Sequence, residues 1–376
     1  MSQRISYRAT RAARTSMISA AVVAALLLSA CQDAVAPVPA PMPARPSLSA
    51  TIAVSGPVDL GTISGGFDGV AWSVNNLQHV VGSNSTPGSL RAVLWTGPGV
   101  AIDLGLLPGG TLSNALAISD VTLPGGREYV AGGADVPCTA AECIFATTGH
   151  AFRWDAQNGM IDLGTLGGLW STAFGVDQFG NVVGVSETRT ASEGHAFIWS
   201  PSTGMRDLGS LSGQHYSAAY DLNGLFIAGT SYVRLPGGGE AVHAARWTPL
   251  GRWQDLGVLP GGHGSSGDAV NSVGWIAGTS ENANGDLRAV LWKTQQPIDL
   301  GVLPGITVSL AEGVNDAGWV VGQSGKQGFV WTELDGMLAL PALGSTYGTA
   351  AHDINGGTAV GNSELRPVMW ILTPAP

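Results

Sequence analysis

The chain has 376 residues and a formal net charge of −10, with charged residues at 12% and 55 glycines. This charged fraction is about half that of an ordinary soluble protein, and the glycine share is about twice the usual one. Disordered chains combine high charge with few β-branched and aromatic residues, so the composition excludes extensive disorder. The acidic balance, without a basic patch in the sequence, also excludes nucleic acid as an expected partner.

A targeting segment occupies residues 1–30. Four arginines precede an apolar stretch at 17–28 that is too short to span a bilayer. The sequence Leu-Ser-Ala-Cys at 28–31 resembles the lipobox of bacterial lipoproteins, which implies cleavage before Cys31 and acylation of that residue. Several acyl chains would hold the mature protein firmly on a membrane. The alternative is an ordinary secretory signal with an incidental Cys. Because Gln32 follows the Cys, where some retained lipoproteins have Asp, we expect the outer membrane of a bacterial envelope.

A linker rich in Pro and Ala follows at residues 31–51, and its composition is typical of an extended, poorly foldable spacer. Loss of residues 1–30 removes four arginines and no acids, which leaves 13 basic residues against 27 acidic ones and a net charge of −14. Such a chain would repel anionic lipid as well as nucleic acid.

A repeat fills residues 52–376. A Trp closes a short apolar run seven times, at Trp95, Trp154, Trp199, Trp247, Trp292, Trp331 and Trp370. The phrase Asp-Leu-Gly begins six times, at Asp59, Asp103, Asp162, Asp207, Asp255 and Asp299, and a degenerate copy stands at 338–340. Each unit divides into four short apolar pieces bounded by turn residues, which predicts antiparallel strands. Four strands with a period of about 40–45 residues are typical of a β-propeller blade.

The two phrases are out of phase at the ends of the chain. The first Asp-Leu-Gly has no Trp before it, and Trp370 has no Asp-Leu-Gly after it. A linear array would not show this offset, whereas a ring would. We expect a strand at about 58–63 to pair with the three strands of 349–370 and bury both open sheet edges. The sequence therefore predicts an all-β fold, a seven-bladed β-propeller of four-stranded antiparallel blades.

Several phrases resemble the HAF family of extracellular repeat proteins. They are Gly-His-Ala-Phe-Arg-Trp at 149–154, Gly-His-Ala-Phe-Ile-Trp at 194–199, Gly-Met-Ile-Asp-Leu-Gly-Thr-Leu-Gly-Gly at 159–168, and the recurring Val-Val-Gly. The resemblance covers about residues 58–371 and implies a bacterial exported repeat protein, without catalytic residues or a known substrate. Four units have another residue in the His slot, namely Arg91, Arg288, Gln327 and Arg366.

Residues that recur are expected to be architectural. His150, His195 and His243 share one slot on three different blades, so we expect one repeated hydrogen bond there rather than a metal site. The Asp-Leu-Gly aspartates are expected to accept backbone N–H groups in turns. Cys138 and Cys143 lie in the one long insertion and are expected to form a local disulfide. A metal site is the less favoured alternative, because no second pair of thiols is nearby.

One position in each first strand varies from unit to unit. In ring order it holds Trp72, Leu116, Phe174, Tyr220, Asp268, Glu312 and His352. The residue before it is nearly always Ala, which indicates strands converging on the axis. We therefore predict a polar wall from Tyr220 to His352, opposite an apolar wall from Trp72 to Phe174. The loops leading into these strands add Trp170, His215, Tyr216, His263 and Tyr347 as further ligand-binding candidates.

A pocket with an aromatic side and an Asp-Glu-His side suits a sugar, a peptide or a cation. The alternative is a water-filled channel whose polar groups bond to water and to each other. The sequence has no nucleophile elbow, His-Glu-x-x-His motif, phosphate loop or dinucleotide fingerprint, so it predicts no cofactor and no metal. The leading hypothesis is a non-enzymatic, lipid-anchored module for recognition or adhesion, with a glycan or protein ligand.

Two other functions stay open. A glycan-active hydrolase or lyase could use Asp268 and Glu312 as acid and base, with His352 assisting, if the two carboxylates lie roughly 5–9.5 Å apart. A scaffold of an envelope assembly would instead expose a sizeable apolar patch.

Overall fold

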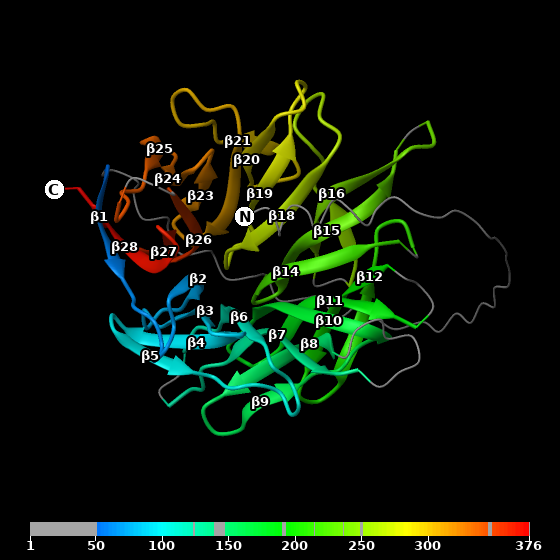
Figure 1. Cartoon of the computed structure of the whole chain (residues 1–376). Helices are drawn as coiled ribbons and strands as arrows, with labels where there is room; N and C mark the ends of the chain where they lie inside the picture. The colour runs from blue at the N-terminus through cyan, green and yellow to red at the C-terminus, as the bar shows by residue number, and fades with distance from the viewer. Residues whose placement is uncertain are drawn as a thin grey trace, which may run out of the picture. The chain divides into compact units, whose positions relative to one another are not determined.

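The computed structural model describes residues 51–375 except for 123–124, 139–146, 190–192, 214, 236, 249–250 and 345–347. These residues form 28 strands in seven four-stranded antiparallel sheets. Figure 1 shows the sheets following one another round a ring, in chain order from blue to red. The fold is therefore the seven-bladed β-propeller that the repeat predicts. In this part of the chain no helix is long and apolar enough to cross a membrane.

The blades follow the sequence units. Blade 1 comprises β2 (Asp68–Val74), β3 (Val80–Thr86), β4 (Ser89–Gly97) and β5 (Val100–Asp103). Blade 2 comprises β6 (Ser113–Ile118), β7 (Val130–Pro137), β8 (Thr147–Asp155) and β9 (Gly159–Asp162). Blade 3 comprises β10 (Gly167–Val176), β11 (Val182–Thr188), β12 (Gly194–Ser200) and β13 (Gly204–Gly209). Blade 4 comprises β14 (Ser217–Asn223), β15 (Phe226–Arg234), β16 (Glu240–Trp247) and β17 (Trp253–Asp255).

The remaining blades have the same order. Blade 5 comprises β18 (Ser265–Val270), β19 (Ile276–Glu281), β20 (Leu287–Trp292) and β21 (Pro297–Asp299). Blade 6 comprises β22 (Ser309–Val314), β23 (Val320–Ser324), β24 (Gln327–Thr332) and β25 (Gly336–Ala339). Blade 7 comprises β26 (Thr349–Asn355), β27 (Thr358–Ser363), β28 (Arg366–Pro374) and, from the other end of the described chain, β1 (Ile52–Asp59).

The first strand of each blade lies innermost. Each one contacts the first strands of both neighbouring blades, all the way round from β2 to β26 and back to β2. The sheets then run outward in chain order to the fourth strands. The convergence of first strands on the axis, expected from the small residues in them, is confirmed.

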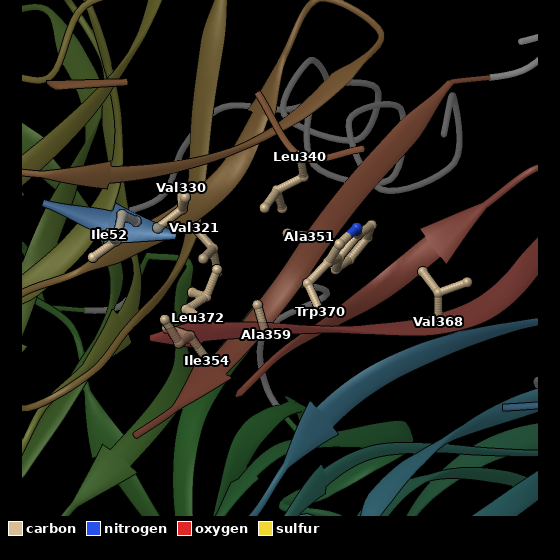
Figure 2. Close-up of a cluster of buried hydrophobic side chains, with 10 residues drawn as sticks. All are labelled: Ile52, Val321, Val330, Leu340, Ala351, Ile354, Ala359, Val368, Trp370 and Leu372. Atoms are coloured by element: carbon tan, nitrogen blue, oxygen red, sulfur yellow. The ribbon is translucent and has the colours of Figure 1, made fainter. Parts of the chain in front are cut away.

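Blade 7 closes the ring by pairing strands from the two ends of the domain. β1 runs antiparallel to β28, from Ile52 opposite Pro374 to Asp59 opposite Val368. Ile52 also joins the buried cluster around Trp370, as Figure 2 shows. The predicted closure is confirmed, but the strand spans 52–59 and not 58–63. The physical reason is that Asp59 ends the strand, and the Leu and Gly after it belong to a turn.

The Asp-Leu-Gly phrase makes the same turn in six blades. The Asp Oδ1 accepts the backbone N–H of the Gly two residues later at 2.7–2.9 Å. Each of these glycines has a positive φ of 65–89°, which favours residues without a Cβ atom. The Leu between them packs into the core, as at Leu60 and Leu256. The expectation that these aspartates are turn acceptors is confirmed.

The same aspartates bind the residue in the His slot of the neighbouring strand. In three blades the partner is a histidine Nδ1 at 2.9 Å, in the pairs His150–Asp162, His195–Asp207 and His243–Asp255. In three others it is an arginine, in the pairs Arg91–Asp103, Arg288–Asp299 and Arg366–Asp59. Blade 6 has Ala339 in place of the Asp, and its slot holds Gln327, whose amide donates to the carbonyl of Leu340. The blade that lacks the acid thus has neither His nor Arg in this slot, and the His slot is architectural.

Asp207 illustrates the electrostatics of these pairs. Burial acts to raise the pKa of its carboxyl, but hydrogen bonds from His195 and from the Gly209 N–H outweigh burial and hold the pKa below its usual value.

Large aromatic side chains fill six of the seven blades in one of two ways. The repeat Trp is fully buried in three blades, at Trp95, Trp292 and Trp370, where the residue two positions earlier is Val. In three others that earlier residue is a fully buried Phe, at Phe152, Phe197 and Phe329, and the Trp is only partly buried. Residues two apart in a strand share a face, so one large ring occupies this space in each case.

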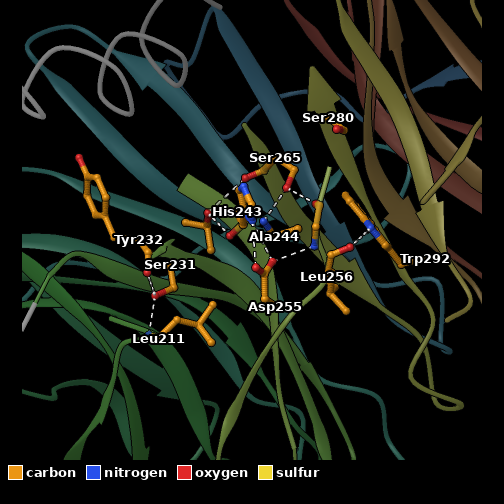
Figure 3. A network of polar contacts seen from close by, with 12 residues as sticks. Leu211, Ser231, Tyr232, His243, Ala244, Asp255, Leu256, Ser265, Ser280 and Trp292 are labelled. Atoms are coloured by element: carbon orange, nitrogen blue, oxygen red, sulfur yellow. Dashed lines mark hydrogen bonds and ion pairs between the residues drawn. The ribbon is translucent and has the colours of Figure 1, made fainter. Parts of the chain in front are cut away.

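A serine hydroxyl joins each of several blades to the previous one. Ser265 Oγ accepts the N–H of Ala244 at 2.8 Å and donates to the carbonyl of Gly257 at 2.7 Å. Both partners lie in blade 4 or its turn, as Figure 3 shows. The same pair of bonds recurs at Ser113, Ser171, Ser217 and Ser309. A single serine side chain therefore fixes the third strand and the following turn of one blade to the first strand of the next.

We expect Ser265→Ala to destabilise the protein by about 1–3 kcal/mol, because a buried N–H and a carbonyl would both lose their partner. Chemical denaturation measures this loss as a lower midpoint. Ser202→Ala, at an exposed turn, is the matched control and should leave the midpoint unchanged. Equal midpoints for the two variants would contradict the proposed role of this hydroxyl.

Candidate functional site

The varying position of each first strand coincides with a β-bulge. In all seven blades the register between the first and second strands shifts at this residue. The bulged residues are Trp72, Leu116, Phe174, Tyr220, Asp268, Glu312 and His352. A bulge leaves a residue out of the ladder and re-aims its side chain. The ring therefore presents seven non-repeated side chains from its innermost strands.

Three of these side chains form a polar group across blades 6, 7 and 1. His352 Nδ1 lies 2.8 Å from a Glu312 carboxylate oxygen, and its Nε2 lies 2.9 Å from Asn362 Oδ1. The Trp72 ring centre is 4.4 Å from that of His352. The bulged residues of blades 6, 7 and 1 therefore contact one another from neighbouring innermost strands.

An aromatic cluster lies on blades 3 and 4. Phe174 packs edge-on against Tyr220 at 5.4 Å, and the hydroxyls of Tyr216 and Tyr220 are 3.4 Å apart. Trp170 packs on the same cluster. The Trp170 indole N–H is buried and has no hydrogen-bond partner among the described residues.

Residues of the predicted polar and apolar walls contact each other at the two places where the walls adjoin in the ring. Trp72 lies against His352, and Tyr220 packs against Phe174. The separation into two walls stays a prediction.

A histidine between two acids extends the aromatic cluster outward. His215 Nδ1 lies 3.9 Å from Glu193, and its Nε2 lies 3.7 Å from Glu240. Tyr232 lies beside it, with ring centres 6.1 Å apart, and also packs edge-on against Tyr216. Burial, together with the charges of Glu193 and Glu240, raises the pKa of Tyr232.

Glu193, Glu240 and Tyr232 are not among the residues predicted from the sequence. The latter two belong to the long hairpin of β15 and β16, which reaches beyond the corresponding hairpins of most other blades. The extra length of this hairpin could have indicated these residues in the sequence, because additional residues at one end of a blade extend its loop.

The other predicted residues have separate surroundings. Asp268 accepts a hydrogen bond from Ser266 at 3.0 Å, and the His263 backbone N–H donates to Glu281 at 3.1 Å. Tyr347, Cys31 and Cys143 lie outside the described residues. The Cys138–Cys143 disulfide therefore stays a prediction.

Two aspartates directly after the bulges lie inside the ring. Asp353 accepts hydrogen bonds from the Ser73 hydroxyl and the Val74 N–H of the next blade, at 2.8 and 3.0 Å. Asp221 accepts the N–H of Val270 from its own next blade at 2.8 Å. Burial, together with the charge of Asp353, raises the pKa of Asp221 to about 7. Burial and the charge of Asp120 likewise raise the pKa of Asp353.

The described residues place no three His, Cys, Asp or Glu side chains so that they could hold a metal ion. The side chains described above offer aromatic surfaces, hydrogen-bonding groups and carboxylates on this side of the ring.

No protein-family model and no curated protein sequence matches the chain, so the resemblance to the HAF family stays a prediction. Among solved structures, the β-propeller domain of the Trilobed protease from Pyrococcus furiosus is 9% identical with a TM-score of 0.49, over 82% of this chain and 96% of that one. TolB from Acinetobacter baumannii is 12% identical with a TM-score of 0.41, over 81% of this chain, which spans 64% of TolB. A gluconolactonase from Xanthomonas campestris is 15% identical with a TM-score of 0.36, over 88% and 99% of the two chains. At these identities the likeness concerns the fold alone.

We expect the stability of Asp221→Asn relative to the wild type to increase as the pH rises from about 4.5 to about 8. Folding raises the pKa of Asp221 to about 7. Protonated Asp221 therefore stabilises the wild-type protein fully at pH values below the unfolded-state pKa. This stabilisation is lost as the pH rises through about 7. Asparagine keeps an acceptor for Val270 and cannot ionise.

Thermal unfolding of both proteins across this range gives the difference in Tm. Asp316→Asn, which changes an exposed carboxyl, should follow the wild type at every pH. A Tm difference between wild type and Asp221→Asn that does not depend on pH would contradict the assigned burial.

Proposed function

We propose that this protein is an exported, lipid-anchored β-propeller that binds a ligand at one end of its ring. The observation that carries the proposal is the position of the non-repeated residues. Where the repeat holds, side chains are occupied by turns, ion pairs and links between blades. Where it is broken, aromatic and carboxylate side chains meet on the innermost strands and at the ends of blades 3 and 4.

The ligand is proposed to bind on what we term the loop face. This face carries the loops that lead into the first strands and the loops that join second to third strands. The two loop sets contact each other: the Tyr216 N–H donates to Glu193 at 3.0 Å, and the Thr111 N–H donates to Asp135 at 2.6 Å. We term the described residues of these loops the rim.

The composition of this rim favours a ligand with both flat apolar surfaces and hydrogen-bonding groups. Trp170 and Tyr216 offer aromatic faces. Glu193 and Glu240 add acceptors and negative charge beside them. Sugars stack on aromatic rings in this way, and amino groups of a glycan or peptide would meet the carboxylates.

Export and anchoring are proposed from residues 1–31. The basic head, the short apolar stretch and the Leu-Ser-Ala-Cys sequence support signal cleavage and acylation of Cys31. The resemblance of the repeat to the HAF family supports export as well. The acidic mature chain would then stand in the bacterial cell envelope, held on the outer membrane.

A glycan hydrolase or lyase is the second candidate. It is favoured by one observation, that Asp268 and Glu312 occupy equivalent bulges of adjacent innermost strands. Binding accounts better for Glu312, because its carboxylate is engaged by His352. Product analysis after incubation with peptidoglycan and envelope polysaccharides separates the two candidates. New reducing or unsaturated ends that disappear in Glu312→Gln would favour catalysis.

We expect Trp170→Ala and Tyr216→Ala each to weaken ligand binding roughly 5- to 30-fold, since one stacked ring contributes about 1–2 kcal/mol. A glycan and muropeptide array probed with the soluble Cys31→Ser form would identify ligands, and calorimetry would measure their affinity. Phe179→Ala, an exposed aromatic at the opposite end of the ring, is the matched control. Unchanged affinity of both rim variants for every ligand found would refute binding at this rim.

We expect Cys31→Ser to move the protein from the membrane fraction to the soluble fraction of the envelope, because acyl chains supply the anchor. Mass spectrometry of the mature N-terminal peptide should show acylated Cys31 in the wild type. An N-terminal peptide that lacks acyl groups, or that begins at another residue, would contradict the proposed anchor.

A further inference from the structure

We infer that the end of the ring opposite the loop face docks on the lipid surface, so that the ligand site points away from the membrane. This end, termed the tether face, carries the turns that join first to second strands and third to fourth strands. The inference rests on the proposed lipid anchor and adds the face by which the propeller meets the bilayer.

The first observation is where the anchored chain reaches the propeller. β1 begins at Ile52, opposite Pro374 at the end of β28. The Ile52 N–H donates to Asp335 at 3.2 Å, and Asp335 lies in the turn between β24 and β25. The chain that comes from Cys31 therefore joins the ring on the tether face.

The second observation is a repeated apolar residue at the tips of the turns on this face. Two residues after the Asn or Asp that ends the first strand, four blades expose a large apolar side chain, at Leu77, Phe179, Leu225 and Val273. Their exposed fractions are 52%, 65%, 68% and 46%. The equivalent residues of blades 2, 6 and 7 are Val121, Ala317 and Gly357.

Turn chemistry does not explain these residues. The turn itself is made by the Asn or Asp, whose Oδ1 accepts the N–H of Leu77 at 3.0 Å and that of Phe179 at 2.9 Å. The residue at the tip contributes only its N–H, and such exposed sites usually hold polar residues. One exposed apolar residue needs no explanation, but the same choice at equivalent tips marks an interaction surface.

Charge favours a lipid surface as the occupant. The tips at 76–78, 178–180, 224–225 and 272–274 contain no Asp, Glu, Lys or Arg, whereas other turns of the tether face carry charges, such as Asp120, Lys293 and Glu333. These tips can therefore enter the boundary between headgroups and acyl chains without dehydrating a charge.

Because the lipid anchor and the linker already hold the propeller near the membrane, weak insertion of the apolar tips is sufficient for docking. The 20 residues at 32–51 separate Cys31 from Ile52. Such a linker spans roughly 25 Å if flexible and about 60 Å if fully extended. The tether face is thus held close to the bilayer at high effective concentration, so a few apolar side chains are enough to dock it.

The loop face is a weaker candidate. It also exposes apolar side chains, at the single positions Phe67 and Leu365 and at the equivalent positions Leu112 and Val308 of blades 2 and 6. The anchored chain does not reach the ring on that face.

The test uses the full, lipidated protein in phosphatidylcholine vesicles that contain a phosphatidylcholine with a photoactivatable acyl chain. After illumination, peptide mapping locates the lipid adducts. We expect adducts at the turns of Leu77, Phe179, Leu225 and Val273, and at least a fivefold loss of adducts at the changed turns in Phe179→Ser/Leu225→Ser. The matched control, Phe67→Ser/Leu365→Ser on the loop face, should keep the wild-type pattern. Both double variants change exposed side chains, and equal Tm values check their folding.

Adducts on loop-face peptides, or no adducts in the propeller, would overturn the inference about docking without contradicting the proposed lipid anchor. Protein–protein adducts between tether faces in place of lipid adducts would overturn it in favour of a second copy. The same digest reports the mass of the N-terminal peptide. An unacylated Cys31 would refute the proposed anchor and, with it, the inference that rests on it.

Discussion

The pairing of β1 with β28 is the constraint on which the structure depends. Without it, blade 7 would have three strands and blade 1 would face an unfinished neighbour. The pairing places Ile52 in the core around Trp370 and brings Leu60 into the cluster shared by blades 7 and 1. Only a closed ring brings seven first strands to one axis, so the arrangement of the bulged residues follows from this contact between distant parts of the chain.

Within the ring, repetition and variation have different physical roles. Recurrent residues satisfy the polar groups that a propeller must bury: the turn aspartate, its His or Arg partner, and the serine between blades. The blade that lacks the aspartate also lacks the His or Arg, which indicates that the two positions act together. The bulge leaves one residue per blade out of the strand ladder, so its side chain does not take part in these structural contacts. Function is therefore expected at the bulges and at the rim beside them.

Much of this could be predicted from the sequence, because local chemistry determines it. Six aspartates followed two residues later by Gly identify a turn, and the phase offset of the repeat identifies closure. The partners of those aspartates could not be predicted, since they depend on the register of two neighbouring strands. The proximity of His215 to Glu193 and Glu240 likewise depends on how two hairpins of neighbouring blades meet. The start of β1 was misplaced because Ile52 lies before the first repeated phrase and resembles linker sequence.

Ring closure is tested most directly by cross-linking the two strands that make it. Ala53 and Thr373 are exposed and directly opposed in the register of β1 and β28. A short thiol cross-linker applied to the folded Ala53→Cys/Thr373→Cys variant should join the two strands within one molecule, as peptide mapping would show, and should raise the Tm. Neither single variant should form this link. Cross-links only between molecules, or none while the protein is folded, would contradict the closed propeller.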